Sequence, residues 1–170
     1  MPIVLIGNII SLLGCTLMVL IGFIKEKRKI LYTQCVQFTL QGAANLILGG
    51  TSGFIANVVS IARNICFTKW KCTLWLKIGF IVIQILLSLG SLMNEGALAL
   101  MPIAAAVLFT WFIDTKSEVT LKIVIISTQI FWLIYDFIHL NYVAVCFDCF
   151  TMVSNIIGIF MIIGIKGKKK

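Results

Sequence analysis

The chain has 170 residues, of which 61% are hydrophobic and only 12% are charged, and its formal net charge is +8. Soluble domains carry about 45–50% apolar and about 25% charged residues, so this chain lacks the polar residues that a water-soluble globule needs for its surface. The apolar residues extend from Ile3 to Ile165 with no polar stretch long enough to form a separate domain. The composition therefore excludes a water-soluble domain and predicts an all-α integral membrane protein with lipid as its main solvent.

Seven apolar stretches follow one another along the chain, and each is predicted to be a transmembrane helix. A lipid-embedded span must pair its own backbone groups, and about 20 helical residues cross the hydrocarbon core. The predicted spans are residues 3–24, 30–49, 52–67, 74–93, 97–113, 119–139 and 142–165. Residues 1–24 lack the basic start and the small-residue cleavage site of a secretory signal, so the first helix is expected to remain as an anchor.

All fourteen Lys and Arg residues fall on one side of this seven-helix arrangement. They occur in the segments 25–29, 63–77, 116–122 and 166–170. Positive residues mark the cytoplasmic side of a membrane protein. The sequence therefore predicts an N-terminus outside and a C-terminus in the cytoplasm. The net charge is then a feature of topology and lipid headgroup contact, and no nucleic-acid partner is predicted.

The chain matches itself when it is shifted by 91 residues, because scarce polar residues then meet polar residues. The matched pairs are Asn45 with Asp136, Asn57 with Asp148, Ser60 with Thr151, and Asn64 with Asn155. The first three predicted helices map onto the last three, and the single helix between them restores the orientation. The predicted fold is two parallel three-helix bundles, residues 1–68 and 95–170, joined by a linker helix at residues 69–94.

Polar side chains form stripes along four of the predicted helices. Such residues are costly in a bilayer and tend to face a bundle interior or a water-filled cavity. The candidate substrate-binding residues are Asn45, Asn57, Asn64, Trp132, Tyr135, Asp136, Asp148 and Asn155. Stripes that face inward would surround a polar cavity for a small polar solute. The amides fit equally well the hydrogen bonds that hold helices together without a cavity.

Two aspartates favour the cavity over simple helix packing. A carboxylate in a membrane helix has a high free-energy cost unless it pairs with a basic group or contacts water. No Lys or Arg lies in the outer half of the predicted helices to pair with Asp136 or Asp148. Each is therefore expected to contact water or to be protonated, which suits a solvated cavity or a proton-coupled step. Asp136 is predicted to lie near the outer interface, where bulk water lowers its cost, so Asp148 is the stronger candidate.

Three further features each have two interpretations. Arg63 is either an inner gate or anion contact, or a side chain that reaches the headgroups. Pro102 is either a hinge or a proline at the start of its helix. Cys146 and Cys149 form a CxxC near a helix start, as in quinone-linked thiol oxidases, but the second outer cysteine pair of such enzymes is missing. No catalytic residue, metal site or cofactor is predicted, and the chain has no GxxxxGK(S/T) motif for ATP.

Several polar and aromatic positions occur in a recognisable order over nearly the whole chain. They are a glycine-bounded turn leading into Asn57-Val-Val-Ser-Ile-Ala-Arg63-Asn64, the run Leu100-Met-Pro102-Ile-Ala with Thr110-Trp111, and Trp132-Leu-Ile-Tyr-Asp136 followed by Asp148 and Asn155. In these stretches the chain resembles the YgjV family of bacterial inner-membrane proteins, which implies the same location. The family pattern has an amide where this chain has Asp136, so the site is more acidic here.

The three-one-three helix plan is also similar to that of SWEET-type sugar facilitators and PnuC-type vitamin transporters. Their substrates lie between the two bundles in contact with Trp and Asn, which implies a pocket around Asn57, Asn64, Trp132 and Asn155 in this chain. The predicted function is transport of a small polar solute by alternating access. A non-transporting membrane scaffold or partner subunit is the alternative. The expected partners are the lipid bilayer and the solute, and a homo-oligomer is left open.

Overall fold

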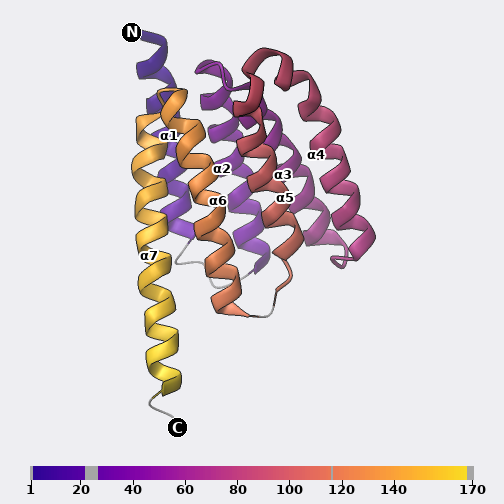
Figure 1. Ribbon diagram of the computed structural model, residues 1–170, viewed down its shortest axis with the longest axis vertical. Coiled ribbons are helices and arrows are strands. Elements are labelled where there is room, and N and C mark those ends of the chain that lie inside the picture. Colours follow the sequence, from indigo (N-terminus) through magenta and orange to yellow (C-terminus); the bar gives the residue numbers. More distant parts are fainter. Residues whose placement is uncertain (1, 22–26, 116, 168–170) are drawn as a thin grey trace.

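The computed structural model describes residues 2–21, 27–115 and 117–167, and these residues are all α-helical apart from short connections. The helices are α1 (Pro2–Ile21), α2 (Lys27–Ile47), α3 (Thr51–Lys69), α4 (Leu74–Glu95), α5 (Leu100–Phe112), α6 (Glu118–Ile138) and α7 (Tyr142–Gly167), with a short 3₁₀ helix, η1 (Gly96–Ala99), before α5. Figure 1 shows them side by side in an elongated bundle with the two termini at opposite ends. The predicted all-α class is confirmed.

Three segments of the described chain are long and apolar enough to cross a membrane. They are Leu74–Phe112, which contains α4, η1 and α5, then Val119–Ile138 and Tyr142–Ile163. Pro2–Met18 is a shorter apolar helix. The remaining helices, α2 and α3, carry much of the polar content of the chain, which lowers their hydropathy.

The burial pattern is the reverse of that in a water-soluble protein. Large apolar side chains face outward, such as Leu86 (60% exposed) and Phe160 (70% exposed). Fully buried side chains include the polar Asn64, Gln84 and Asn141. A soluble protein places its apolar side chains inside, so this distribution indicates a surface in contact with lipid.

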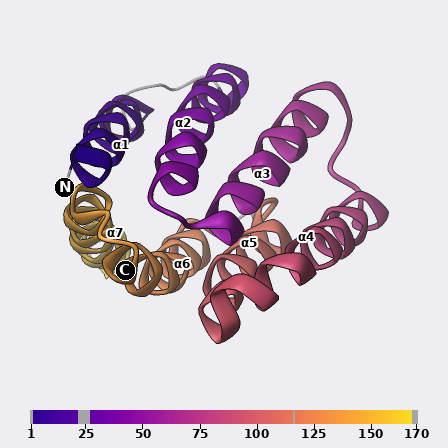
Figure 2. The same cartoon turned by 90° about the horizontal axis from the view of Figure 1, so that it is seen from above.

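Helices that follow one another in the chain pack against each other, and the last helix also packs against the first. Each helix contacts the next, with α2 between α1 and α3 and α6 between α5 and α7. In addition, α1 packs against α7 and α3 packs against α5. The view from above shows this order, with α7 returning to the side of α1 (Figure 2). The first three helices therefore contact the last three along two helix pairs.

Helix bounds follow the 91-residue shift. Adding 91 to the bounds of α2 gives the bounds of α6, and adding 91 to the first residue of α3 gives the first residue of α7. The contact of α1 with α7 becomes the contact of α5 with α3 under the same shift. Thus α2 and α6 have the same length, and the first three helices pack in the same order as the last three.

The turns after α2 and α6 have the same backbone structure. Gly49 (φ 86°) and its equivalent Leu140 (φ 60°) both adopt the left-handed conformation. The next residues, Gly50 and Asn141, donate their N–H groups to the carbonyl oxygens five positions earlier, at 2.7 and 2.9 Å. These bonds define a Schellman motif, which ends a helix and reverses the chain.

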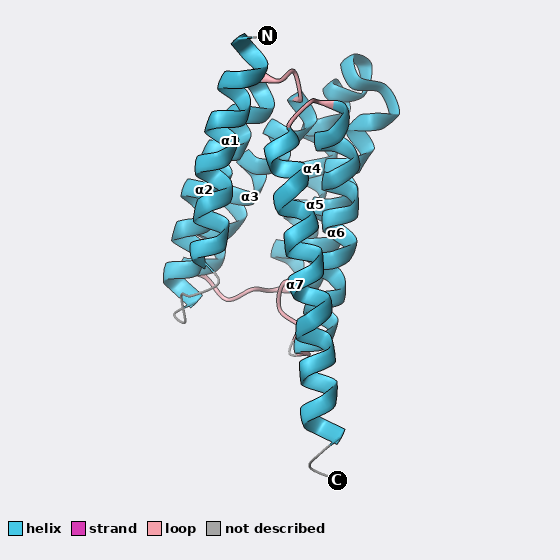
Figure 3. Cartoon of the chain, turned by 90° about the vertical axis from the view of Figure 1, so that its left-hand side faces the viewer, coloured by secondary structure: helices cyan, strands magenta, loops and turns pink. Residues whose placement is uncertain are grey.

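Basic residues at helix ends gather at one end of the bundle, which we name the lysine-rich end. Lys29 lies in the first turn of α2, Lys69 ends α3, Lys77 lies in the first turn of α4 and Lys122 lies near the start of α6. Figure 1 shows these helix ends on the same side as the C-terminus. The turns α2–α3, α4–α5 and α6–α7 lie at the opposite end, as the side view also shows (Figure 3).

Candidate functional site

The two predicted aspartates lie inside the bundle near the end opposite to the lysines. Asp136 is 4% exposed and Asp148 is 7% exposed. Asn141 donates its side-chain N–H to Asp136 Oδ1 at 3.1 Å and, more weakly, to Asn45 Oδ1 of α2 at 3.5 Å. Oδ2 of Asp148 is buried and has no hydrogen-bond partner among the described residues. The structure therefore brings three predicted residues, Asn45, Asp136 and Asp148, into one region, which we name the carboxyl pair region.

Neither aspartate has a basic partner in the part of the chain that the structure describes. The ion pairs there are Lys77 with Asp114 and His139 near Glu95. The two carboxyl groups also interact electrostatically with each other. The expectation that Asp136 is exposed to bulk water was wrong, because the turn after α6 folds Asn141 against its carboxyl group. Burial therefore gives no reason to prefer Asp148 over Asp136.

A polar stripe on α1 adjoins the carboxyl pair region, and the sequence analysis missed it. Ser11 donates to Gln41 Oε1 at 3.0 Å, and Gln41 Nε2 donates to Cys15 Sγ at 3.0 Å. The Cys15 thiol is buried and interacts electrostatically with both aspartates. The spacing of Asn8, Ser11 and Cys15 along α1 would have revealed one helix face.

Arg63 and Asn64 lie in a separate polar group nearer the lysine-rich end. Arg63 is 2% exposed, donates to Thr110 Oγ1 of α5 at 3.0 Å and to Asn64 Oδ1 at 3.2 and 3.3 Å, and lies over the Phe109 ring at 5.1 Å. Asn64 donates to Gln34 Oε1 of α2 at 2.9 Å. The interpretation of Arg63 as a side chain that reaches the headgroups was wrong, because its guanidinium is buried and ties α3 to α5.

The other predicted residues do not converge with these groups. Asn57 of α3 and Asn155 of α7 each donate to the carbonyl four residues earlier in their own helix at 2.8 Å. Trp132 is half-buried and makes an edge-to-face contact with Tyr135 at 5.9 Å between ring centroids. The structure thus does not gather the eight candidate residues around one cavity.

The structure also locates Pro102 and the two cysteines of the CxxC sequence. Pro102 lies in the first turn of α5, where a proline fits without a kink, so its position matches the start-of-helix interpretation. Cys146 and Cys149 are free thiols on the exposed side of α7.

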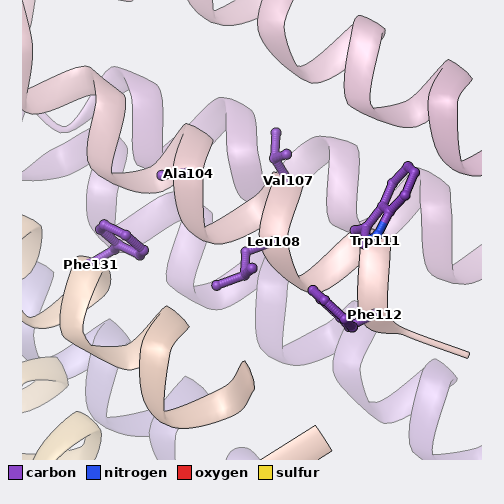
Figure 4. A pocket seen from close by; sticks show the side chains of 6 residues that line it. All are labelled: Ala104, Val107, Leu108, Trp111, Phe112 and Phe131. Carbon is purple, nitrogen blue, oxygen red and sulfur yellow. The ribbon is translucent and has the colours of Figure 1, made fainter. Parts of the chain in front are cut away.

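Two hollows in the described surface are lined mainly by apolar side chains. One of about 390 Å³ lies between α5 and α6 and is shown in Figure 4, with Ala104, Val107, Leu108, Trp111, Phe112 and Phe131 as its lining residues. The other, of about 600 Å³, lies between the starts of α1 and α7 and is lined by Val4, Leu5, Asn8, Leu140 and Tyr142. Neither contains a predicted site residue, and the first offers almost no polar group to bind a polar solute.

A comparison with curated proteins and with solved structures gives no match. A family model described as bacterial inner membrane protein, Imp-YgjV, matches residues 5–165. This match covers nearly the whole chain, including every helix that contributes to the polar groups above, and agrees with the lipid-facing apolar surface. The chain therefore belongs to the Imp-YgjV family and is a bacterial inner membrane protein.

Proposed function

We propose that the protein carries a small polar solute across the inner membrane by alternating access. In this proposal all seven helices span the membrane, α1–α3 and α5–α7 form two parallel three-helix units, and α4 links them. The equivalent Schellman turns and the equivalent contacts α1–α7 and α3–α5 support the two units. Parallel repeats related by an axis along the membrane normal are an established transporter plan.

The orientation follows from the basic residues. The lysine-rich end faces the cytoplasm in this proposal, because Lys and Arg are retained on that side of bacterial inner membranes. The turns α2–α3, α4–α5 and α6–α7 then face the periplasm, and we name this end the outer end. The N-terminus lies outside and the C-terminus lies inside.

The observation that carries the proposal is the carboxyl pair region. Asp136 and Asp148 are buried where helices of both units meet, without a basic partner among the described residues. Burying an ionisable group without a partner is costly, and membrane proteins retain such groups mainly in solute, ion or proton pathways. The two carboxyl groups therefore suit a proton, a cation or the hydrogen-bond donors of a polar solute.

Cys15 supplies a direct test, because its buried thiol adjoins this region. A variant in which Cys15 is the only cysteine would be placed in vesicles of known orientation and treated with a charged, membrane-impermeant thiosulfonate. Alternating access predicts that Cys15 is modified from at least one face. A second variant with Cys72 as the only cysteine, in the connection between α3 and α4, provides the control and should react from the cytoplasmic face only.

A scaffold function is the second candidate, and one observation favours it. Asn57 and Asn155 use their side-chain donors within their own helices instead of presenting them to a cavity. A static scaffold keeps its interior closed, so Cys15 would then resist modification from both faces while Cys72 still reacts. That outcome would remove the transport proposal.

A further inference from the structure

The carboxyl group of Glu95 binds the start of α3. Glu95 lies at the end of α4, and its side chain is only 5% exposed. The backbone N–H of Ser52 donates to Glu95 Oε1 at 2.8 Å, and the hydroxyl groups of Thr51 and Ser52 donate to the same carboxyl group. The first N–H groups of a helix have no partner within the helix, and a carboxylate there also complements the helix dipole. Glu95 therefore serves as the cap of α3.

The same carboxyl group also binds α6, which belongs to the other three-helix unit. The Tyr135 hydroxyl donates to Glu95 Oε2 at 3.1 Å and accepts the N–H of Gly53 at 2.9 Å. His139 Nε2 lies 3.7 Å from Glu95 Oε2, and its ring packs on the Tyr135 ring with centroids 4.4 Å apart. Glu95 is thus a common acceptor for groups from both units at the outer end.

The start of α7 is capped in an equivalent way. The N–H of Val143, which is the repeat equivalent of Ser52, donates to Asn8 Oδ1 at 3.0 Å. Asn8 also donates to the Leu140 carbonyl at 2.9 Å. Each third helix is therefore capped by a side chain from another helix of the bundle: Glu95 at the end of α4 caps α3, and Asn8 of α1 caps α7.

We propose that these two caps form the outer gate of the carrier, with Glu95 as its stronger closing contact and Asn8 as its weaker one. This inference rests on the proposed transport function, since it assigns a closed outer end to the structure. Opening that end separates Glu95 from α3 or from Tyr135, so a buried acidic group loses several donors at once. Hydrogen bonds to a charged group are stronger than those of a neutral amide such as Asn8.

The experiment uses the variant with Cys15 as the only cysteine and measures its modification rate from the periplasmic face. Glu95→Gln removes the charge and should raise this rate about tenfold or more, because hydrogen bonds to a charged group are stronger than those to a neutral amide. Tyr135→Phe removes one donor to Glu95 and should act in the same direction with less damage to folding. Asn8→Ala should give a smaller increase. Asp114→Asn, which alters the ion pair with Lys77 at the lysine-rich end, is the matched control and should leave the outer rate unchanged.

Thermal unfolding of each variant in detergent distinguishes opening of the outer gate from a loss of the folded structure. If the outer rate in both Glu95→Gln and Tyr135→Phe equals the parent rate while Cys15 still reacts from the cytoplasmic face, the gate assignment is wrong and transport stands. If Cys15 reacts from neither face in any variant, both proposals fail. If Asp114→Asn raises the outer rate as much as Glu95→Gln does, the effect is not specific to the outer end and the gate assignment is also wrong.

Discussion

Leu140 adopts the same left-handed backbone conformation as Gly49, its equivalent after a shift of 91 residues. A side chain in this conformation costs roughly 1–2 kcal/mol, and glycine avoids that cost. The hydrogen bonds of the two turns match position by position. The chain therefore keeps one turn structure in both units even where the residue is unfavourable, which indicates that the reversal itself, and not local preference, is required at the outer end.

The two turns predict how glycine substitutions will behave. Gly49→Ala should lower the free energy of unfolding by about 1 kcal/mol, because its φ is 86° although no atom lies within 4 Å of the added Cβ. Gly90→Ala meets equally open space inside α4 and should be neutral or stabilising by about 0.5–1 kcal/mol. Thermal unfolding in detergent measures both. Equal effects of the two substitutions would contradict the conformational explanation.

A second pair of glycines tests the packing of Tyr135. An added Cβ at Gly53 would lie 2.7 Å from the Tyr135 ring and 2.6 Å from Asn45 Nδ2, both of which are buried. Gly53→Ala should therefore destabilise the protein by about 1–3 kcal/mol.

Gly158 is the control for this steric effect. A Cβ there would lie 2.8 Å from Lys122 Nζ, the end of a flexible side chain that can move away. Gly158→Ala should leave the unfolding temperature nearly unchanged. A large loss of stability at Gly158, or none at Gly53, would show that the rigidity of the Tyr135 contact has no role.

The carboxyl pair predicts a non-additive pair of substitutions. Asp148→Asn changes a group that interacts electrostatically with Asp136, and Asp148 Oδ2 has no hydrogen-bond partner among the described residues. We expect Asp136→Asn and Asp148→Asn together to differ from the sum of the single changes by about 0.5–3 kcal/mol, as for residues in one network. A double-mutant cycle of unfolding free energies in detergent measures this difference. Strict additivity would show that the two carboxyl groups do not interact.

The contacts of Arg63 predict that a lysine at this position will lower the stability of the protein. Arg63→Lys removes the planar group that contacts Thr110, Asn64 and the Phe109 ring together, and should lower stability by about 1.5–3 kcal/mol. Lys69→Gln changes an exposed cation at the end of the same helix and should have little effect. If the two substitutions cost the same, the contacts of Arg63 with α5 do not stabilise the fold.

The proposed orientation gives a prediction that needs no purified protein. A fluorescent protein fused after Lys170 should fold and fluoresce, because the C-terminus is proposed to lie in the cytoplasm. A periplasmic alkaline phosphatase fused at the same position should be inactive. The opposite pair of results would reverse the orientation, and the outer gate would then face the cytoplasm.

The sequence by itself determined that lipid is the main solvent of this protein and that its fold is all α-helical. Transfer of apolar residues into lipid depends on composition and length, and not on which helices are neighbours. The shift of 91 residues that pairs Asn45 with Asp136 also relates the bounds of α2 to those of α6. Hydropathy and helix length are properties of single segments, and the shift compares only spacings along the chain, so all three can be read from the sequence.

Only the tertiary structure decided which polar groups meet. Asn57 and Asp148 are repeat equivalents, yet the first bonds within its own helix and the second keeps a buried oxygen without a partner among the described residues. Glu95, at the end of α4, caps α3 and accepts a hydrogen bond from the Tyr135 hydroxyl of α6. Such contacts depend on the rotation and depth of helices far apart in the chain, and a polar residue that is costly in lipid takes whichever partner that arrangement brings within hydrogen-bond distance.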